Sequence, residues 1–289
     1  MSRREEILAK VAKVVAIPSC VQKALALLND PDADLGELAR IIEHDPGLTV
    51  NLLKIVNASF FGGNRPMSTA REAIVRLGTA QVLQFVISTG VAPSFVHKIE
   101  GYDLAPNMHL QHSVTVAMAA RELGDVLGVK TPDHAFTAGL VSGVGKILLG
   151  AYVQVNVHPI LTLALEEGLS FDQAEDQVLG INHAELGGMV LDNWGLPREL
   201  TDVVRYHLRP DEFDGEDLTL DLVHIGNVLA KMIGVGLGVD GLNYEVSKKV
   251  AERLNLTPAI LDTVSANVVE GLGEVWDLFM ECAEDSCKI

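Results

Sequence analysis

The sequence is poor in cysteine and in basic residues, and both shortages narrow what the protein can be. Only three cysteines occur among 289 residues, Cys20, Cys282 and Cys287, and they are widely separated. This odd number predicts neither a disulfide framework nor a thiolate zinc site. Lysine and arginine number 22 against 39 aspartates and glutamates, so the formal net charge is −17. A chain this acidic repels phosphate groups, and we expect neither nucleic acid nor a membrane surface as its partner.

The sequence also lacks a long uninterrupted apolar run. The longest apolar stretch, 222–239, contains His224, Asn227, Lys231 and four glycines, which makes it a poor membrane span. The first residues mix acidic and basic side chains and lead into no apolar segment of the signal-peptide kind. We therefore expect a cytoplasmic protein. Because 48% of its residues are hydrophobic and 21% are charged, the chain has the composition of a globular protein.

Alternating β-branched runs with hairpin turns are missing, whereas helical periodicity is common. Apolar residues recur at helical spacing in 35–43, 48–56 and 110–127. Thr69-x-x-Glu72 and Ser170-x-x-Gln173 resemble capping boxes that begin helices. One short segment, 153–157, does alternate, but it ends at His158-Pro159 and fits a helix end and loop equally well. The pattern predicts an all-α fold with a dozen or more helices.

A boundary is expected near residue 100. Gly101 and Pro106 interrupt the periodicity of 99–107, and the charge balance changes there. Residues 1–100 hold 11 basic and 10 acidic side chains, whereas residues 101–289 hold 11 basic and 29 acidic ones. We therefore predict an N-terminal helical module over 1–100 and a larger helical part over 101–289.

Three motifs that suggest ligands do not fit their usual contexts. Residues 236–241 satisfy G-x-G-x-x-G, but they follow an apolar helical run rather than a strand, so a helix end and loop is expected. Residues 142–146 resemble a phosphate-binding loop but lack its first glycine and its final serine or threonine. The acidic loop 209–217 does not have the ligand spacing of a calcium loop and is expected to be solvated.

Several short segments, in their order along the chain, carry a resemblance to a known family. They are Asn29-Asp30-Pro31, Glu43-His44-Asp45-Pro46, Lys54-Ile55-Val56-Asn57, Ala73-Ile74-Val75-Arg76-Leu77-Gly78, Trp194-Gly195-Leu196-Pro197 and Arg205-Tyr206-His207-Leu208-Arg209-Pro210. Together they resemble the HDOD family of bacterial signalling proteins, relatives of the HD-domain phosphohydrolases, over about residues 10–210. The resemblance implies a multi-helical HD-like core with an additional N-terminal helical module, which looks like a docking module. Within that module, Phe60, Phe61 and Phe85 are expected to be core residues.

The resemblance also implies where metal ligands would lie. HD-domain enzymes hold one or two metal ions with histidines and aspartates. Here His112 matches the first metal histidine, and His183 and His207 match histidines that bind a second metal. The defining His-Asp pair is replaced by Ser142 and Gly143. The aspartate ligand that these enzymes supply from a later helix is replaced by Asn227.

These replacements remove the carboxylates from the implied ligand set. Hard cations such as magnesium and manganese prefer carboxylate ligands, so we expect no catalytic residues and no resident cofactor. Three histidines would still suit a softer divalent metal. We expect His112, His183 and His207 to line one buried pocket, together with Lys146 and Arg205, and each imidazole in it to be neutral near pH 7.

The resulting hypothesis is a non-catalytic regulatory protein that acts in signal transduction through a protein partner or a small ligand. One alternative is a metal-dependent phosphohydrolase on nucleotides or cyclic dinucleotides. A second is a nucleotide sensor without turnover. The sensor would need a basic pocket, for which the mapped region offers only Lys146, Arg205 and Arg209.

Overall fold

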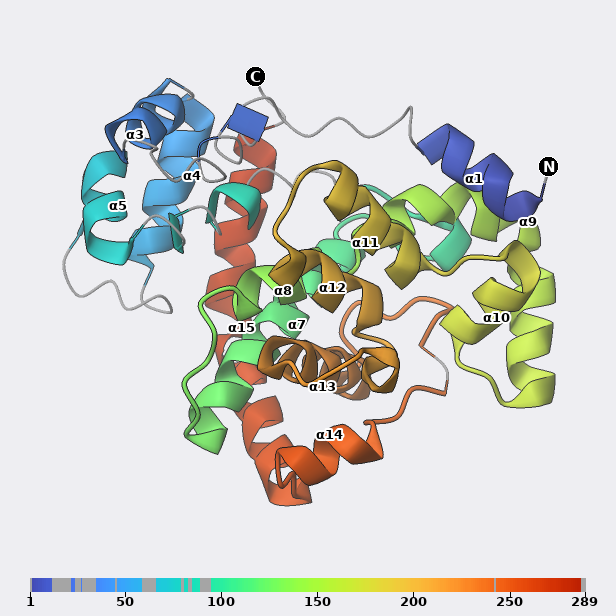
Figure 1. The fold of residues 1–289 in the computed structure, drawn as a ribbon. Coiled ribbons are helices and arrows are strands. Elements are labelled where there is room, and N and C mark those ends of the chain that lie inside the picture. Colours follow the sequence, from blue (N-terminus) through green and yellow to red (C-terminus); the bar gives the residue numbers. More distant parts are fainter. Residues whose placement is uncertain are drawn as a thin grey trace. The chain divides into compact units, whose positions relative to one another are not determined.

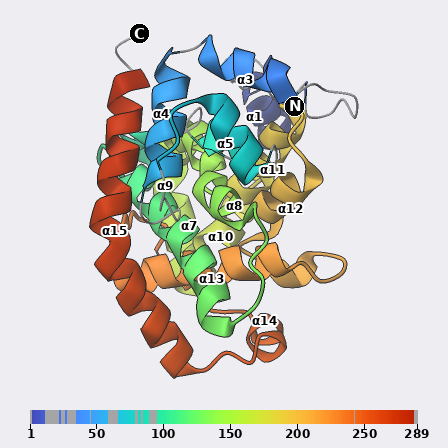
Figure 2. The same ribbon diagram turned by 90° about the vertical axis from the view of Figure 1, so that its left-hand side faces the viewer.

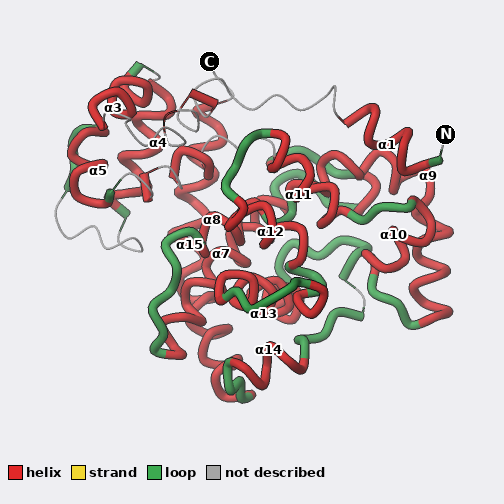
Figure 3. The backbone as a smooth tube through the Cα atoms, viewed as in Figure 1, coloured by secondary structure: helices red, strands yellow, loops and turns green. Residues whose placement is uncertain are grey.

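The structure is a computed structural model that describes residues 2–11, 22–23, 27, 35–44, 46–58, 66–78, 81–82, 85–88, 95–241 and 243–286. Within these ranges every regular element is a helix, apart from one isolated bridge between Ile99 and Leu104 (Figure 3). The predicted all-α class is confirmed. Phe60 and Phe61 lie outside the described residues.

The chain forms two compact units. The larger unit combines Met1–Val15 with Phe95–Glu270, and the smaller unit combines Ala16–Ser94 with Gly271–Ile289. The N-terminal segment therefore differs from the predicted module of residues 1–100, because its helix packs within the larger unit. In this helix Ile7 is fully buried among apolar residues of the larger unit, and Arg4 forms an ion pair with Glu185 at 2.5 Å.

The larger unit is built from helices that the periodicity predicted and from short connections between them (Figure 1). Its elements are α1 (Arg3–Val11), η3 (Glu100–Tyr102), α7 (Met108–Leu127), α8 (Ala135–Val141), α9 (Val144–Glu167), α10 (Phe171–Leu179), α11 (His183–Asn193), α12 (Arg198–Tyr206), η4 (Pro210–Glu212), α13 (Leu218–Ile233), α14 (Lys248–Arg253) and the first part of α15 (Pro258–Ser286).

The smaller unit contains α3 (Leu35–Glu43), α4 (Pro46–Asn57), α5 (Ala70–Leu77) and the end of α15. Its helices bury one apolar face each, with Leu38, Leu52 and Ile74 among the fully buried side chains. Thr69 begins α5 as predicted, because its hydroxyl accepts a hydrogen bond from the Glu72 N–H at 3.0 Å. Phe85 is buried, in agreement with its expected place in a core.

The centre of the larger unit is α7, which packs against both α8 and α13 (Figures 1 and 2). Two glycines permit this close approach. A Cβ atom on Gly139 of α8 would lie 2.8 Å from the Ala117 Cα, and one on Gly226 of α13 would lie 2.8 Å from the Val116 carbonyl oxygen. Both distances are shorter than van der Waals contact, so larger residues would push these helices away from α7.

Helix α9 continues through Pro159 to Glu167, so the alternating segment 153–157 is neither a strand nor a helix end. The proline removes one N–H from the hydrogen-bond ladder, but buried apolar residues on both sides of it hold the helix together. The stretch Ala135–Glu167 is the one part of the described chain that is long and apolar enough to cross a membrane. Because 78% of its most apolar window is buried inside the protein, it has the character of a core helix.

Candidate functional site

Most side chains predicted for the site are buried in the larger unit, where α7, α9, α11 and α13 meet. His112 lies on α7, Lys146 on α9, His183 at the start of α11 and Asn227 on α13. All four are at most 5% exposed. His207, directly after α12, and Ser142, directly before α9, are buried as well. Arg205 is half-buried and lies elsewhere, as described below.

His112 and Asn227 contact each other directly. The side-chain amide of Asn227 lies 3.1 Å from Nε2 of His112, and Nδ1 of His112 lies 3.1 Å from the Val235 carbonyl oxygen. Burial lowers the pKa of His112 to about 4, so the ring is neutral near pH 7 and carries one N–H. That N–H donates to Val235, so Nε2 is an acceptor. The structure places Oδ1 of Asn227 beside it, and a half-turn of the amide directs the NH₂ group, which otherwise has no hydrogen-bond partner among the described residues, to Nε2. The imidazole expected to bind the first metal thus bonds instead to the residue that replaces the later aspartate ligand.

Gly143 has no room for a side chain because His109 fills the space. A Cβ atom on Gly143 would lie 2.4 Å from Cε1 of His109, and Nε2 of His109 donates to the Gly143 carbonyl oxygen at 3.0 Å. The His109 ring also packs against Phe95, with ring centroids 4.6 Å apart. Ser142 turns its hydroxyl to the Gly139 carbonyl oxygen at 2.8 Å. The His-Asp positions therefore present no ligand atoms to a metal.

The sequence analysis did not select His109, although a signal was available. His109 precedes His112 by three residues on the same helix, so both rings lie on one face of α7. Burial lowers the pKa of His109 well below its ordinary value, and the positive charge of Lys146 lowers it further. The ring is therefore neutral and packs as part of the core.

His183 is oriented by a buried carboxylate that the sequence analysis also missed. Glu175 on α10 is fully buried and accepts hydrogen bonds from the His183 backbone N–H at 2.9 Å and from its Nδ1 at 2.7 Å. The Tyr102 hydroxyl donates to the other Glu175 oxygen at 2.5 Å. His183 follows Glu175 by eight residues across the turn between α10 and α11, a spacing that matches no common ligand motif.

His207 lies near His183 but bonds to its own helix. Its Nδ1 donates to the Val204 carbonyl oxygen at 2.8 Å. Burial lowers the pKa of His207 well below its ordinary value, although the hydrogen bond to Val204 opposes this. Within the described residues, Nε2 of neither ring takes part in a hydrogen bond.

Lys146 forms a buried ion pair with Asp240. The Lys146 Nζ lies 2.6 Å from the Asp240 carboxylate, and the two side chains are 6% and 4% exposed. Although burial alone would raise the pKa of Asp240, the charges of Lys146 and Lys231 hold it far below its ordinary value. Asp240 belongs to the glycine-rich segment 236–241, which forms the loop after α13 as expected for a helix end. Its role was missed because 94 residues separate it from Lys146.

The mapped residues do not fit the metal ions of HD-domain enzymes. Within the described ranges, no group of three or more histidine, cysteine, aspartate or glutamate side chains is placed to hold a metal ion. Nε2 of His112 is occupied by Asn227, and Gly143 is covered by His109. The carboxylates of the region, Glu175 and Asp240, already satisfy His183 and Lys146. A divalent hard cation would find no free anionic ligand among these described residues.

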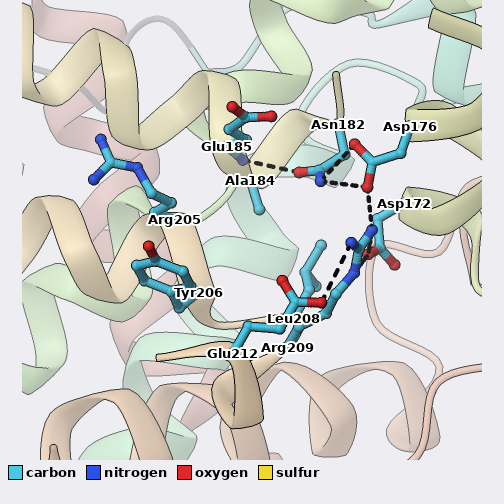
Figure 4. Close-up of a pocket in the computed structure, with 10 residues that line it drawn as sticks. All are labelled: Asp172, Asp176, Asn182, Ala184, Glu185, Arg205, Tyr206, Leu208, Arg209 and Glu212. Atoms are coloured by element: carbon cyan, nitrogen blue, oxygen red, sulfur yellow. Dashed lines mark hydrogen bonds and ion pairs between the residues drawn. The ribbon is translucent and has the colours of Figure 1, made fainter. Parts of the chain in front are cut away.

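A cavity of about 250 Å³ lies beside this network, between α10, α11 and α12 (Figure 4). The side chains that line it include Arg205 but none of His112, His183, His207 and Lys146; they are Asp172, Asp176, Asn182, Ala184, Glu185, Arg205, Tyr206, Leu208, Arg209 and Glu212. The expectation that Arg205 joins the histidines in one pocket is therefore not met. Arg205 pairs with Asp192 and Asp202 instead, because α12 presents it to the surface.

The arginines of the cavity are neutralised by neighbouring carboxylates. Arg209 donates to Asp172 at 2.7 Å and to Asp176 at 2.5 Å. Burial opposes ionisation of Asp172, but the Arg209 charge and the hydrogen bonds from Ser170 and Arg209 act together against it, and the pKa of Asp172 is lowered. With Glu185 and Glu212 also on its wall, the cavity has an excess of negative charge. It is a poor site for a phosphate group.

Comparison with known proteins gives one family and a consistent fold. The model of the HDOD domain matches residues 14–210. An uncharacterised protein of Treponema pallidum is 20% identical over 198 residues, which is 68% of this chain and only 38% of that protein. An HDOD domain protein of unknown function from Geobacter sulfurreducens has a TM-score of 0.70, 22% identity and 97% coverage of both chains. A Shewanella amazonensis protein, provisionally named a phosphohydrolase, has a TM-score of 0.68 with 21% identity, covering 96% of this chain and 98% of its own. A Marinobacter aquaeolei protein, provisionally named a signal transduction protein, has a TM-score of 0.68 with 20% identity. The match covers 96% of this chain and 61% of the Marinobacter chain.

Proposed function

The chain belongs to the HDOD domain family, and we propose that it is a non-catalytic regulatory protein of bacterial signal transduction. In this proposal the chain keeps the helical core of the HD phosphohydrolases without their chemistry. It acts by binding a protein partner, and it does so in the cytoplasm. The fold it shares with the Geobacter, Shewanella and Marinobacter proteins is compatible both with regulation and with hydrolysis. The choice between them rests on the side chains at the former metal site.

The observation that carries the proposal is the direct contact between His112 and Asn227. Metal-dependent hydrolysis needs a cation that activates water and neutralises the phosphate, and this cation needs open ligand positions. Here Nδ1 of the histidine donates to a carbonyl oxygen and the side-chain amide of Asn227 covers Nε2 at 3.1 Å, so neither ring nitrogen is open to a metal. His109 fills the space of an aspartate side chain at position 143. The ring of His112 is thus held by groups of the protein itself.

The surroundings also argue against a nucleotide sensor. The three basic groups of the mapped region each have an acidic partner: Lys146 has Asp240, Arg205 has Asp192, and Arg209 has Asp172 and Asp176. A phosphate would have to displace one of these carboxylates and leave it unpaired. For the buried Asp172 and Asp240 that is expensive, because an isolated buried charge costs several kcal/mol.

We expect no phosphohydrolase activity. Purified protein with added manganese or magnesium should not release product from phosphomonoesters, cyclic dinucleotides or (p)ppGpp above the rate of a protein-free control. The reason is that no open carboxylate and histidine ligands converge on a metal within the described part of the chain. Product release should be measured for the wild type and for His112→Ala in parallel. Turnover that disappears in His112→Ala would overturn the proposal in favour of an enzyme.

Restoring the ligands tests whether Ser142, Gly143 and Asn227 occupy the positions of former metal ligands. The triple variant Ser142→His, Gly143→Asp, Asn227→Asp should be strongly destabilised, because an aspartate side chain at position 143 collides with His109. Adding His109→Ala removes the collision, and this quadruple variant should bind manganese at least tenfold more tightly than the wild type. Calorimetric titration measures the affinity, and His109→Ala alone is the matched control. Equal affinity of a folded quadruple variant and the control would show that these positions are not the former metal site.

A further inference from the structure

One face of α9 is largely exposed and carries no aspartate, glutamate, lysine or arginine. Helix α9 packs against η3, α10 and α11, yet Val155 remains 77% exposed and Leu165 66% exposed. The stripe comprises Ala151, Val155, His158, Thr162 and Leu165. No aspartate, glutamate, lysine or arginine occurs anywhere in residues 147–165. Surface helices of soluble proteins carry charged residues on the solvent face, so this face is built for contact with another surface.

The spacing of the stripe indicates a helical partner. Its members follow one another at intervals of four, three, four and three residues. This is the spacing of the core positions in a two-helix coiled coil, here occupied by the apolar Ala151, Val155 and Leu165 and by the polar His158 and Thr162. Residues 151–165 span about 21 Å at a rise of 1.5 Å per residue. A second helix of similar length can therefore lie along the whole stripe.

We propose that the occupant is α9 of a second copy of this chain, in the antiparallel orientation. The charges at the two ends of the stripe support this choice. At the N-terminal end, Lys10 of α1 lies with its Nζ 5.5 Å from the centre of the Tyr152 ring, and it is exposed although it also contacts Glu6. At the C-terminal end the exposed Glu166 and Glu167 follow the stripe.

Helical geometry places these charges on the same flank. Glu166 comes fourteen residues after Tyr152, which is close to four turns of about 3.6 residues. An antiparallel pair related by a two-fold axis near His158 then brings Lys10 of each copy beside Glu166 of the other. The same arrangement sets the small Ala151 opposite the large Leu165, so that the two surfaces interlock. A parallel pair would instead bring the glutamates of both copies together.

The contact is modest in size. One helix from each copy buries roughly 1,000 Å² in total, at the small end of specific interfaces. The net charge of −17 on each copy opposes association. We therefore expect a dimer with a dissociation constant on the order of 10 μM at moderate salt.

Sedimentation equilibrium of the full chain tests the dimer. Wild-type protein at about 100 μM should be mainly dimeric, and Val155→Glu or Leu165→Glu should weaken association at least tenfold, because each introduces two charges into the contact. Val75→Glu is the matched control, since Val75 of α5 is also 75% exposed but lies outside the stripe. Its dissociation constant should equal that of the wild type. A wild type that stays monomeric at 100 μM, or a dimer insensitive to Val155→Glu, would overturn the proposal.

Charge reversal tests the orientation. Lys10→Glu and Glu166→Lys should each raise the dissociation constant severalfold, and the double variant should restore it to near the wild-type value. No restoration would exclude the antiparallel arrangement. Flotation with vesicles of phosphatidylcholine and phosphatidylglycerol provides a second arm. If monomers bind these vesicles and Val155→Glu abolishes that binding, the stripe contacts a lipid surface and the dimer is rejected.

Discussion

Lowering the pH from 7 to 5 should strongly destabilise the larger unit, because four of its buried histidines have lowered pKa values. Burial is the main cause for His109, His112, His207 and His224. Each ring uses its single N–H in a hydrogen bond to a backbone carbonyl oxygen, at distances between 2.8 and 3.1 Å. Nε2 of His224 also accepts from the Ser247 N–H at 2.9 Å. These bonds suit neutral imidazoles, and a second proton has no acceptor at Nε2 of His224.

The direction of the pH effect follows from comparing the folded and unfolded chains. In the unfolded chain the histidines take up protons near their ordinary pKa of 6.5, whereas in the folded chain they do so only at lower pH. Above pH 6.5 the histidines are neutral in both states, so protonation does not affect the free energy of unfolding. As the pH falls from 6.5 towards 4, the unfolded chain binds protons that the folded chain does not, and the free energy of unfolding decreases. For His112, with a folded pKa of about 4, the loss is about 3 kcal/mol over that window.

Urea unfolding at pH 7.5, 6.5, 5.5 and 4.5 measures this effect in a Trp276→Phe background, in which the remaining Trp194 is a fluorescence probe within the larger unit. The free energy of unfolding should fall by several kcal/mol between pH 6.5 and 4.5. His112→Gln should reduce the change of the free energy of unfolding with pH by up to about 1.4 kcal/mol per pH unit, the value for one proton. His97→Gln, which changes an exposed histidine, serves as the control and should leave the slope unchanged. A free energy that stays constant from pH 7 to pH 5 would contradict the neutral histidine core.

Removing one partner of the buried pair between Lys146 and Asp240 should cost about 3–5 kcal/mol of folding stability. Lys146→Met leaves the Asp240 carboxylate in the core without its hydrogen-bond donor. The nearby Lys231 offsets part of this loss, because its pKa of about 7 is lowered by burial and also by the charge of Lys146, which this variant removes. Its Nζ lies 3.0 Å from the centre of the Tyr244 ring and makes no hydrogen bond within the described chain.

The double variant Lys146→Met, Asp240→Leu should recover most of this loss. It removes both charges, so neither the carboxylate nor the ammonium group of the pair is left in the core without its partner. Chemical denaturation of the two single variants and the double variant gives the coupling energy of the pair. Lys98→Met breaks an exposed pair with Glu100 and should change stability by less than about 0.5 kcal/mol. A double variant no more stable than Lys146→Met would show that the pair is not the source of the loss.

Local features of the sequence were sufficient to predict the fold class. Helical periodicity and caps depend on residues within a few positions of one another, and Thr69 and Ser170 begin helices as their motifs predict. The absence of carboxylates at positions 142, 143 and 227 is likewise a property of the residues themselves. The prediction that these positions supply no carboxylate ligand therefore rests on the residues alone.

The partners that replace that chemistry depend on tertiary packing. His109 fills the space at Gly143, Asn227 bonds to His112, and Asp240 pairs with Lys146, at sequence separations of 34, 115 and 94 residues. Separations of this length leave no periodic signal. Only the packing of α13 on α7, and the placing of the start of α9 beside His109 and beside the loop after α13, bring the groups within hydrogen-bond distance. Arg205 illustrates the opposite case, because two residues separate it from His207 but α12 directs the two side chains to different environments. A buried polar group must find a partner wherever the fold provides one, and that place is decided by packing.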